Sequence, residues 1–293
     1  MIITNKLGLP QAFVEMCKKD YQQRENEYRV TSLLKSTREA ILERRHEKEI
    51  ERDVSDMIWL LFGTAVHNIL ESHQELDCEL KEERLRVQVG EYTLSGKFDL
   101  YNSEEKKITD YKTASVWKII YRDYEDWKQQ LLVYSYMMRS YGFEVNKGEA
   151  VAVLKDHSKR DAKNKKDYPE LPVQKVTFNF KEKDFQEIEK WIHNRFEEIK
   201  AAEQLPNDEL PLCTPEERFN SGDKFAVMKG KNKRAVRVFD TWEEAEKYLS
   251  ESEKGTHIDT RPGEDKKCED YCNVNQFCNY YQNKKGDTAC PAV

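Results

Sequence analysis

The stretch GKFDLYNSEEKKITDYKT, from Gly96 to Thr113, is the one around which we expect the chain to be organised. It predicts two β-strands joined by a polar, turn-forming connection at Asn102 to Lys107. In an antiparallel hairpin that turns in the middle of this connection, Asp99 lies directly opposite Asp110. Directly opposed side chains share one face of a sheet, so the two carboxylates become neighbours.

A lysine joins this pair of carboxylates. Side chains alternate along a strand, so Lys112 shares the face of Asp110 while Tyr111 points to the other face. Carboxylate oxygens suit a hard cation such as Mg²⁺, which keeps several waters and takes phosphate oxygens as further ligands. A lysine beside such a metal orients a water or stabilises charge in the transition state. The layout predicts metal-assisted phosphodiester hydrolysis, and the alternative is a solvated hairpin edge whose charges oppose aggregation.

A predicted helix from Val54 to His73 precedes the hairpin. Gly63, His67 and Glu71 are spaced i, i+4 and i+8 in it, so they form one stripe along the helix. Asp53 or Ser55 caps its start. A lone histidine on such a helix is either a structural residue or a ligand.

A second predicted helix, Tyr124 to Tyr141, follows the hairpin. Gln130 and Tyr134 are i and i+4 and point the same way. Without further context, they are a surface glutamine and a core tyrosine.

Taken in chain order, these elements resemble the RecB-like branch of the PD-(D/E)XK nucleases, most strongly over residues 30 to 140. The elements that carry the resemblance are His67, Asp99, Asp110-x-Lys112 and Gln130-x-x-x-Tyr134. The resemblance implies a restriction-endonuclease-like α/β core with a mixed central sheet flanked by helices. The strands expected to build it are Glu79 to Val89, Glu91 to Tyr101, Lys106 to Thr113 and Glu149 to Lys155.

The resemblance also implies roles for the site residues. The implied ligands of Mg²⁺ or Mn²⁺ are His67, Asp99, Asp110 and the carbonyl of Tyr111. Lys112 would position the attacking water, and Gln130 and Tyr134 would orient the site or the strand.

Composition sets outer limits on the function. The 293 residues include 49 basic and 55 acidic ones, and the net charge of −6 does not favour a nonspecific DNA coat, although it does not exclude a nuclease. No apolar run approaches the ~18 residues of a membrane span. The N-terminus lacks a basic-then-apolar signal pattern. We therefore expect a cytoplasmic protein of a bacterial or phage-infected cell, with no membrane partner.

Two basic segments are candidate nucleic-acid contacts. The polar loop Asp156 to Pro169 carries Lys159, Arg160 and Lys163, and the turn of a second hairpin, Lys224 to Phe239, carries Lys231, Lys233 and Arg234. A helix from Asp240 to Leu249 completes a ββα unit that resembles a small hybrid-binding module of some ribonuclease H proteins. The alternatives are a solvated loop and a packing appendage.

The chain has seven cysteines, and three of them form a cluster near the C-terminus, Cys268-x3-Cys272-x5-Cys278. Thiolates select zinc or an iron–sulfur cluster. The resemblance favours iron and sulfur, although the chain has Ser36 where such nucleases usually carry the fourth cysteine. Cys213 is the preferred replacement, followed by Cys290, with Cys17 as a further candidate; the alternative is reduced thiols without metal.

The expected domains are a nuclease core with N-terminal helices (1–205), a basic ββα insertion (206–260) and a cysteine-rich tail that packs back on the core (261–293). The expected function is a metal-dependent DNA nuclease, most simply an exonuclease, acting on single- or double-stranded ends in recombination, repair or phage DNA processing. A recombination or single-strand-binding protein is its expected partner. Two alternatives stay open, a non-catalytic DNA-binding scaffold and a CRISPR-adaptation nuclease.

Overall fold

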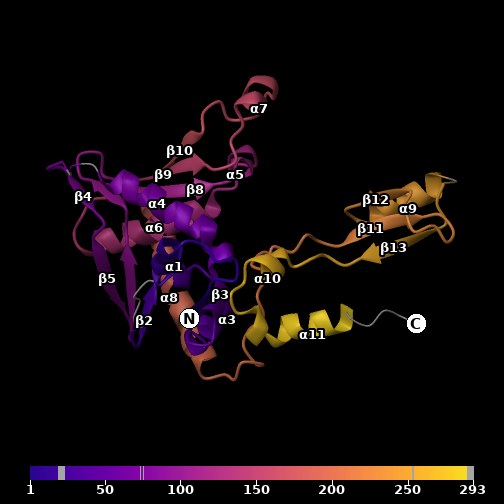
Figure 1. Ribbon diagram of the computed structural model, residues 1–293, viewed down its shortest axis with the longest axis horizontal. Helices are drawn as coiled ribbons and strands as arrows, with labels where there is room; N and C mark the ends of the chain where they lie inside the picture. The colour runs from indigo at the N-terminus through magenta and orange to yellow at the C-terminus, as the bar shows by residue number, and fades with distance from the viewer. Residues whose placement is uncertain (19–23, 73, 75, 253, 289–293) are drawn as a thin grey trace. The chain divides into compact units, whose positions relative to one another are not determined.

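The structure is a computed structural model that describes residues 1–18, 24–72, 74, 76–252 and 254–288. The chain divides into two units, Met1–Leu205 and Pro206–Val293, and each is described by itself (Figure 1). Within the described ranges, no helix combines the length and the apolar character that a membrane crossing requires.

A five-stranded mixed sheet forms the centre of the first unit (Figure 1). In spatial order its strands are β10 (Val173–Asn179), β9 (Lys147–Leu154), β8 (Lys107–Ala114), β7 (Leu100–Asn102) and β4 (Glu79–Lys81). β8 and β9 run parallel, and the other neighbouring pairs run antiparallel. Helices pack on this sheet, so the predicted α/β class with a mixed, helix-flanked sheet is confirmed.

The strand predicted at Glu91 to Tyr101 is wrong as a single element. It is broken into β6 (Tyr92–Lys97) and β7, with Phe98 and Asp99 between them. β6 belongs to a separate three-stranded sheet, ordered β2-β6-β5, with β2 at Glu27–Arg29 and β5 at Arg84–Val89. The chain thus leaves one sheet and enters the next at the predicted active-site aspartate.

The strand predicted at Glu79 to Val89 is also divided, into β4 and β5. Glu82 between them has a φ of 57°, a left-handed conformation that interrupts extended backbone. β4 joins the central sheet beside β7, while β5 pairs with β6. The two breaks, at Glu82 and at Phe98–Asp99, therefore face each other across the junction of the two sheets.

Helices and one short strand pair complete the first unit. The strands β1 (Ile2–Thr4) and β3 (Glu51–Asp53) run parallel. The helices are α1 (Gln11–Cys17), α2 (Val30–Leu33), α3 (Thr37–Arg45), η1 (Val54–Met57), α4 (Ile58–Glu71), α5 (Val116–Ile120), α6 (Glu125–Ser140), α7 (Lys159–Asn164) and α8 (Glu182–Glu203).

The basic segment predicted as a loop at Asp156 to Pro169 contains the short helix α7. The Ser158 hydroxyl accepts a hydrogen bond from the Asp161 backbone N–H at 3.2 Å and so caps this helix. The serine cap was present in the sequence, but the charged residues after it gave no apolar periodicity to mark a helix.

The core of the first unit includes one face of α8, where it packs against α6 and α3. This face is an apolar stripe that is buried throughout, and it consists of Phe185, Ile188, Ile192, Phe196 and Ile199. Tyr92 of β6 stacks on Phe196, with ring centroids 5.2 Å apart. This packing joins α8 to the second sheet.

The second unit contains the predicted hairpin and helix, with one strand more. β11 (Lys224–Met228) pairs with β12 (Arg237–Phe239) on one side and with β13 (His257–Arg261) on the other. The remaining helices are α9 (Trp242–Glu251), α10 (Lys266–Asp270), η2 (Asn275–Phe277) and α11 (Asn279–Thr288). The sequence of β13 is polar and its residues are mostly exposed, so it lacked the hydrophobic alternation that predicts a strand.

Candidate active site

The two predicted carboxylates are linked through the backbone of β8. The strand register pairs Leu100 with Thr109, which places Asp99 and Asp110 at the next opposed positions. Asp99 lies in the bend before β7, and its Oδ2 accepts a hydrogen bond from the Tyr111 N–H at 2.6 Å. Both aspartates are buried. The break between β6 and β7 thus lets the Asp99 side chain accept a hydrogen bond from β8, the strand that carries Asp110.

Lys112 is held between Asp110 and the helix α6. Its Nζ lies 2.6 Å from Asp110 Oδ2 as an ion pair and donates a hydrogen bond to Gln130 Oε1, also at 2.6 Å. Gln130 Nε2 in turn donates to Asp110 Oδ1 at 3.3 Å. These three side chains close a triangle, so the lysine head is fixed beside the carboxylate.

Tyr134 lies one helical turn beyond Gln130 and is buried. Its ring packs over Gly96 of β6, where an added Cβ atom would stand 2.6 Å from the Tyr134 ring and 2.8 Å from Val30. Burial and the negative charge of Asp110 raise the pKa of Tyr134. The tyrosine therefore stays a neutral phenol against the acidic site.

Helix α4 lies along β8 and carries His67. The approach is close because a Cβ atom on Gly63 would stand only 3.2 Å from Thr113 Oγ1. One turn later His67 meets the edge of Tyr111, with ring centroids 6.1 Å apart, and its Nδ1 lies 3.6 Å from Asp99 Oδ1. The side chain of Glu71 lies outside the described part of the structure.

The electrostatics of the pair favour a cation. Burial, followed by the negative charge of Asp110, raises the pKa of Asp99 to about 6. Two carboxylates this close disfavour each other's ionised form, and a positive ion between them removes that repulsion.

The residues present fit a hard divalent ion. Oδ2 of Asp110 is buried and lies 2.6 Å from the Lys112 ammonium group, so a metal ion at this carboxylate would share it with the lysine. In the described ranges, no three His, Cys, Asp or Glu side chains are grouped to hold a metal. Mg²⁺ needs no such group, since one or two carboxylates, waters and substrate phosphates complete its shell.

The cysteines are only partly gathered, and all of the described ones are free thiols. The charges of Cys213 and Cys278 both act on Cys268, so these three lie near one another. Burial first, then the neighbouring Asp265, raises the pKa of Cys268 to about 11. However, the described thiols form no metal-holding group, so the iron–sulfur prediction finds no support here. Cys290 lies outside the described residues.

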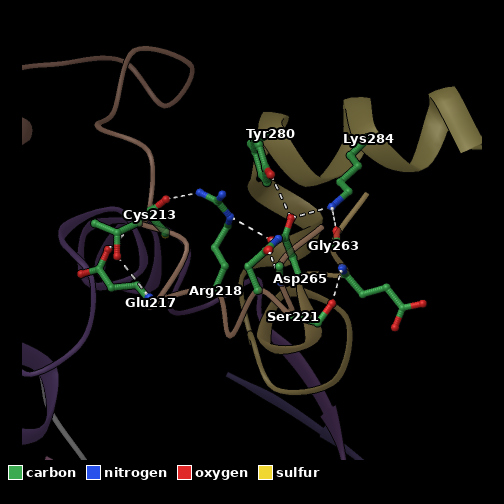
Figure 2. Close-up of polar contacts among 12 residues, drawn as sticks. Cys213, Glu217, Arg218, Ser221, Gly263, Asp265, Tyr280 and Lys284 are labelled. Atoms are coloured by element: carbon green, nitrogen blue, oxygen red, sulfur yellow. Dashed lines mark hydrogen bonds and ion pairs between the residues drawn. The ribbon is translucent and has the colours of Figure 1, made fainter. Parts of the chain in front are cut away.

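A buried carboxylate, Asp265, organises the segments that carry these cysteines (Figure 2). It is 2% exposed and accepts hydrogen bonds from four side chains, namely Arg218, Asn220, Tyr280 and Lys284. Arg218 also donates to the Cys213 carbonyl, and the Cys268 N–H donates to the Asp265 carbonyl. Nothing in the sequence singled this residue out, because Asp265 is one of four acidic residues around Cys268, with Glu264, Glu269 and Asp270.

Ser36, which stands where the resemblance expects a cysteine, has a structural role. It is buried and caps α3 by accepting a hydrogen bond from the Glu39 N–H at 3.2 Å. The predicted basic contacts are exposed in both units: Lys159, Arg160 and Lys163 on α7, and Lys231, Lys233 and Arg234 between β11 and β12.

The family is shown by comparison with known proteins. A family model of the PD-(D/E)XK nuclease superfamily matches residues 9–218, which is well over half of the chain. The chain therefore belongs to this superfamily, as the order of its motifs predicted. A search of curated proteins finds no significant match.

Two solved structures show the range of likeness. The chain is similar to SSO0001 with 17% identity and a TM-score of 0.46, over 67% of this chain and 85% of that one. It is similar to a phage-related exonuclease from Haemophilus somnus 129PT with 12% identity and a TM-score of 0.30, over 65% and 82% of the two chains.

Proposed function

We propose that this superfamily member is a divalent-metal-dependent DNA nuclease of the RecB-like kind, acting as an exonuclease in recombination, repair or phage DNA processing. The observation that carries the proposal is the pair of buried carboxylates, Asp99 and Asp110, with the Lys112 ammonium group 2.6 Å from Asp110 Oδ2. Paired carboxylates beside a lysine are suited to a hard divalent ion and a phosphate substrate.

In this proposal Asp99 and Asp110 would hold Mg²⁺ or Mn²⁺. His67, whose Nδ1 lies 3.6 Å from Asp99 Oδ1, and the carbonyl of Tyr111 would complete the ligand set once the ion is bound. The bound ion would polarise the scissile phosphate and lower the pKa of a bound water. Lys112, fixed by Gln130, presents an ammonium group to the attacking water and to the charge that develops on the phosphate. Tyr134, packed on Gly96, joins α6, the helix that carries Gln130, to β6.

The cysteine cluster is a separate proposal. Ligand chemistry alone favours an iron–sulfur cluster, with zinc as the alternative, on Cys213, Cys268, Cys272 and Cys278. Metal analysis and the visible absorption spectrum of protein purified without oxygen distinguish iron, zinc and metal-free thiols.

The nuclease is tested with labelled linear single- and double-stranded DNA, and with RNA of the same sequence, in Mg²⁺, Mn²⁺ or chelator. Lys112→Ala is compared with Lys175→Ala, a change of an exposed lysine on β10. We expect metal-dependent cleavage of DNA that is lost only in Lys112→Ala, and end-labelled products that give the polarity. If folded, metal-replete wild type cuts no substrate, the chain is a non-catalytic binding protein.

A further inference from the structure

Two large aromatic side chains are exposed just past the end of β8. Trp117 and Tyr121, on and directly after α5, are 51% and 73% exposed. Their rings stack on each other with centroids 5.6 Å apart and planes inclined by 24°. Stacked aromatic rings left in water are unusual, and such surfaces commonly mark a binding site.

Hydrogen bonds fix this pair to the strands of the active site. The hydroxyl of Ser115 and the N–H of Val116, at the start of α5, both donate to the Asp156 carboxylate, at 2.6 and 2.7 Å. The Lys155 N–H donates to the Ala114 carbonyl at 3.0 Å. The ends of β8 and β9 are therefore tied together, and α5 starts from this junction, four residues beyond Lys112.

A third exposed aromatic residue belongs to the same region. Trp59 on α4 is 61% exposed, and the Lys155 ammonium lies over its ring, 4.6 Å from the centroid. Trp59 shares a helical stripe with Gly63, which meets Thr113, and with His67, which meets Tyr111. The stripe therefore leads from the candidate metal site towards the end of β8, over about 12 Å of helix.

Positive charge accompanies these rings. Helix α7 begins three residues after Asp156, and Figure 1 shows α5 and α7 at the same end of the sheet. Its exposed cations Lys159, Arg160 and Lys163 form no ion pair with any residue that the structure describes. Exposed rings beside unpaired cations on a chain of net charge −6 indicate a local site for a polyanion with flat apolar groups.

We propose that the Trp117–Tyr121 pair is a stacking platform for unpaired nucleobases of a DNA strand, with Trp59 and Lys155 as its continuation and α7 along the phosphates. Every base has a π-face, so such a platform binds single strands without reading sequence. Duplex bases are already stacked and cannot use it. A second copy of this chain is the rival occupant, but it would bring the same cations against this face. The route of the strand into the metal site rests on the proposed nuclease function.

The test is fluorescence anisotropy in chelator, which prevents cleavage and so separates binding from catalysis. The probes are an oligothymidylate of about 12 nucleotides, an abasic strand of equal length and a duplex. The variants are Trp117→Leu, which keeps apolar bulk without a π-face, Trp117→Phe, and the control Tyr271→Leu, a 66% exposed tyrosine of the second unit.

We expect Trp117→Leu to bind oligothymidylate about tenfold more weakly, with Trp117→Phe and Tyr271→Leu close to wild type. The abasic strand should bind all four proteins equally. An equal loss on the abasic strand, no loss at all, or no binding by wild type overturns the platform. A change of oligomeric state in Trp117→Leu, seen by sedimentation, would assign the face to protein contact instead. Binding as expected without any metal-dependent cleavage would overturn the nuclease proposal alone.

Discussion

At the scale of single residues, the site depends on side chains that never need to touch the substrate. Gln130 is the clearest of these, because it accepts from Lys112 and donates to Asp110. An amide can do both at once, whereas a carboxylate or an ammonium group can do only one. The glutamine therefore keeps the Lys112 ammonium group and the Asp110 carboxylate at a fixed separation.

Replacing Gln130 with alanine should slow cleavage by about 10- to 100-fold and raise the Mn²⁺ concentration needed for half-maximal rate. Without the amide, the Lys112 head pairs with Asp110 alone and competes with the metal for that carboxylate. Cleavage rates measured across a Mn²⁺ titration check this. Gln129→Ala, one position earlier on α6, is the matched control. An unchanged metal dependence in Gln130→Ala would remove the glutamine from the positioning role.

Gly96 also supports the site without touching the substrate, because it leaves room for the Tyr134 ring. A methyl group there meets the Tyr134 ring at 2.6 Å and Val30 at 2.8 Å. Gly96→Ala should therefore destabilise the protein by about 1–3 kcal/mol, measured by denaturant unfolding. Thr93→Ala on the same strand should change little.

A double-mutant cycle separates the Tyr134 contact from a general effect on the strand. The cost of Gly96→Ala should shrink when Tyr134 is already leucine, because the larger ring is gone. Strictly additive free energies would show that the tyrosine is not what the methyl group displaces.

At the scale of elements, the motif residues could be predicted, and the breaks between strands could not. Spacing alone brought Asp99 opposite Asp110 and put Lys112 beside it, because a period of two is a property of any strand. The division at Phe98–Asp99 is a tertiary event, since β6 and β7 belong to different sheets. No local signal in the sequence separates a strand that continues from one that changes partners.

The start of the segment predicted as one helix from Val54 was predictable for the opposite reason, since a cap is local. Asp53, one of the two predicted caps, accepts hydrogen bonds from the Ser55 N–H and hydroxyl and begins η1, whereas α4 starts four residues later, after Met57, without a side-chain cap. Asp53 also accepts from the Thr4 hydroxyl and the Lys6 N–H. The contacts with Thr4, the last residue of β1, and with Lys6 just after it span 47 to 49 positions, and only the structure shows them.

These hydrogen bonds to Asp53 should make the stability of the fold depend on pH in the acidic range. The backbone N–H of Lys6, together with Ser55, lowers the pKa of Asp53 well below its usual range. A lowered folded-state pKa adds stability that is present above the unfolded pKa of about 3.9 and is lost as pH falls through the folded value.

The denaturation midpoints of wild type and Asp53→Asn should therefore differ most near neutral pH and converge below about pH 4. The exposed Asp167→Asn should follow wild type at every pH. A midpoint gap that stays constant into acid would mean that Asp53 acts through shape rather than charge.

At the scale of the whole molecule, the chain forms two units. In the sequence, their boundary is marked only by three closely spaced prolines. Pro206, Pro211 and Pro215 lie at the start of the second unit. Within that unit Asp265 connects the segment before the small sheet, through Arg218 and Asn220, with α11 after it, through Tyr280 and Lys284. Five side chains from three segments meet here, which no spacing rule on the sequence could reveal.

Asp265→Ala should loosen the second unit and leave the first intact. It removes the carboxylate between Arg218 and Lys284, and a cation left without its buried partner destabilises by about 3 kcal/mol. Arg218 donates to the Cys213 carbonyl, and the backbone of Asp265 accepts from the Cys268 N–H. Because the variant loosens both segments, the thiols of this unit should become more reactive towards alkylation. The buried Cys17 of the first unit should keep its wild-type rate. Asp259→Ala, an exposed change on β13, is the control. Equal alkylation rates at Cys268 in wild type and Asp265→Ala would mean that the cysteine segments are held by something other than this carboxylate.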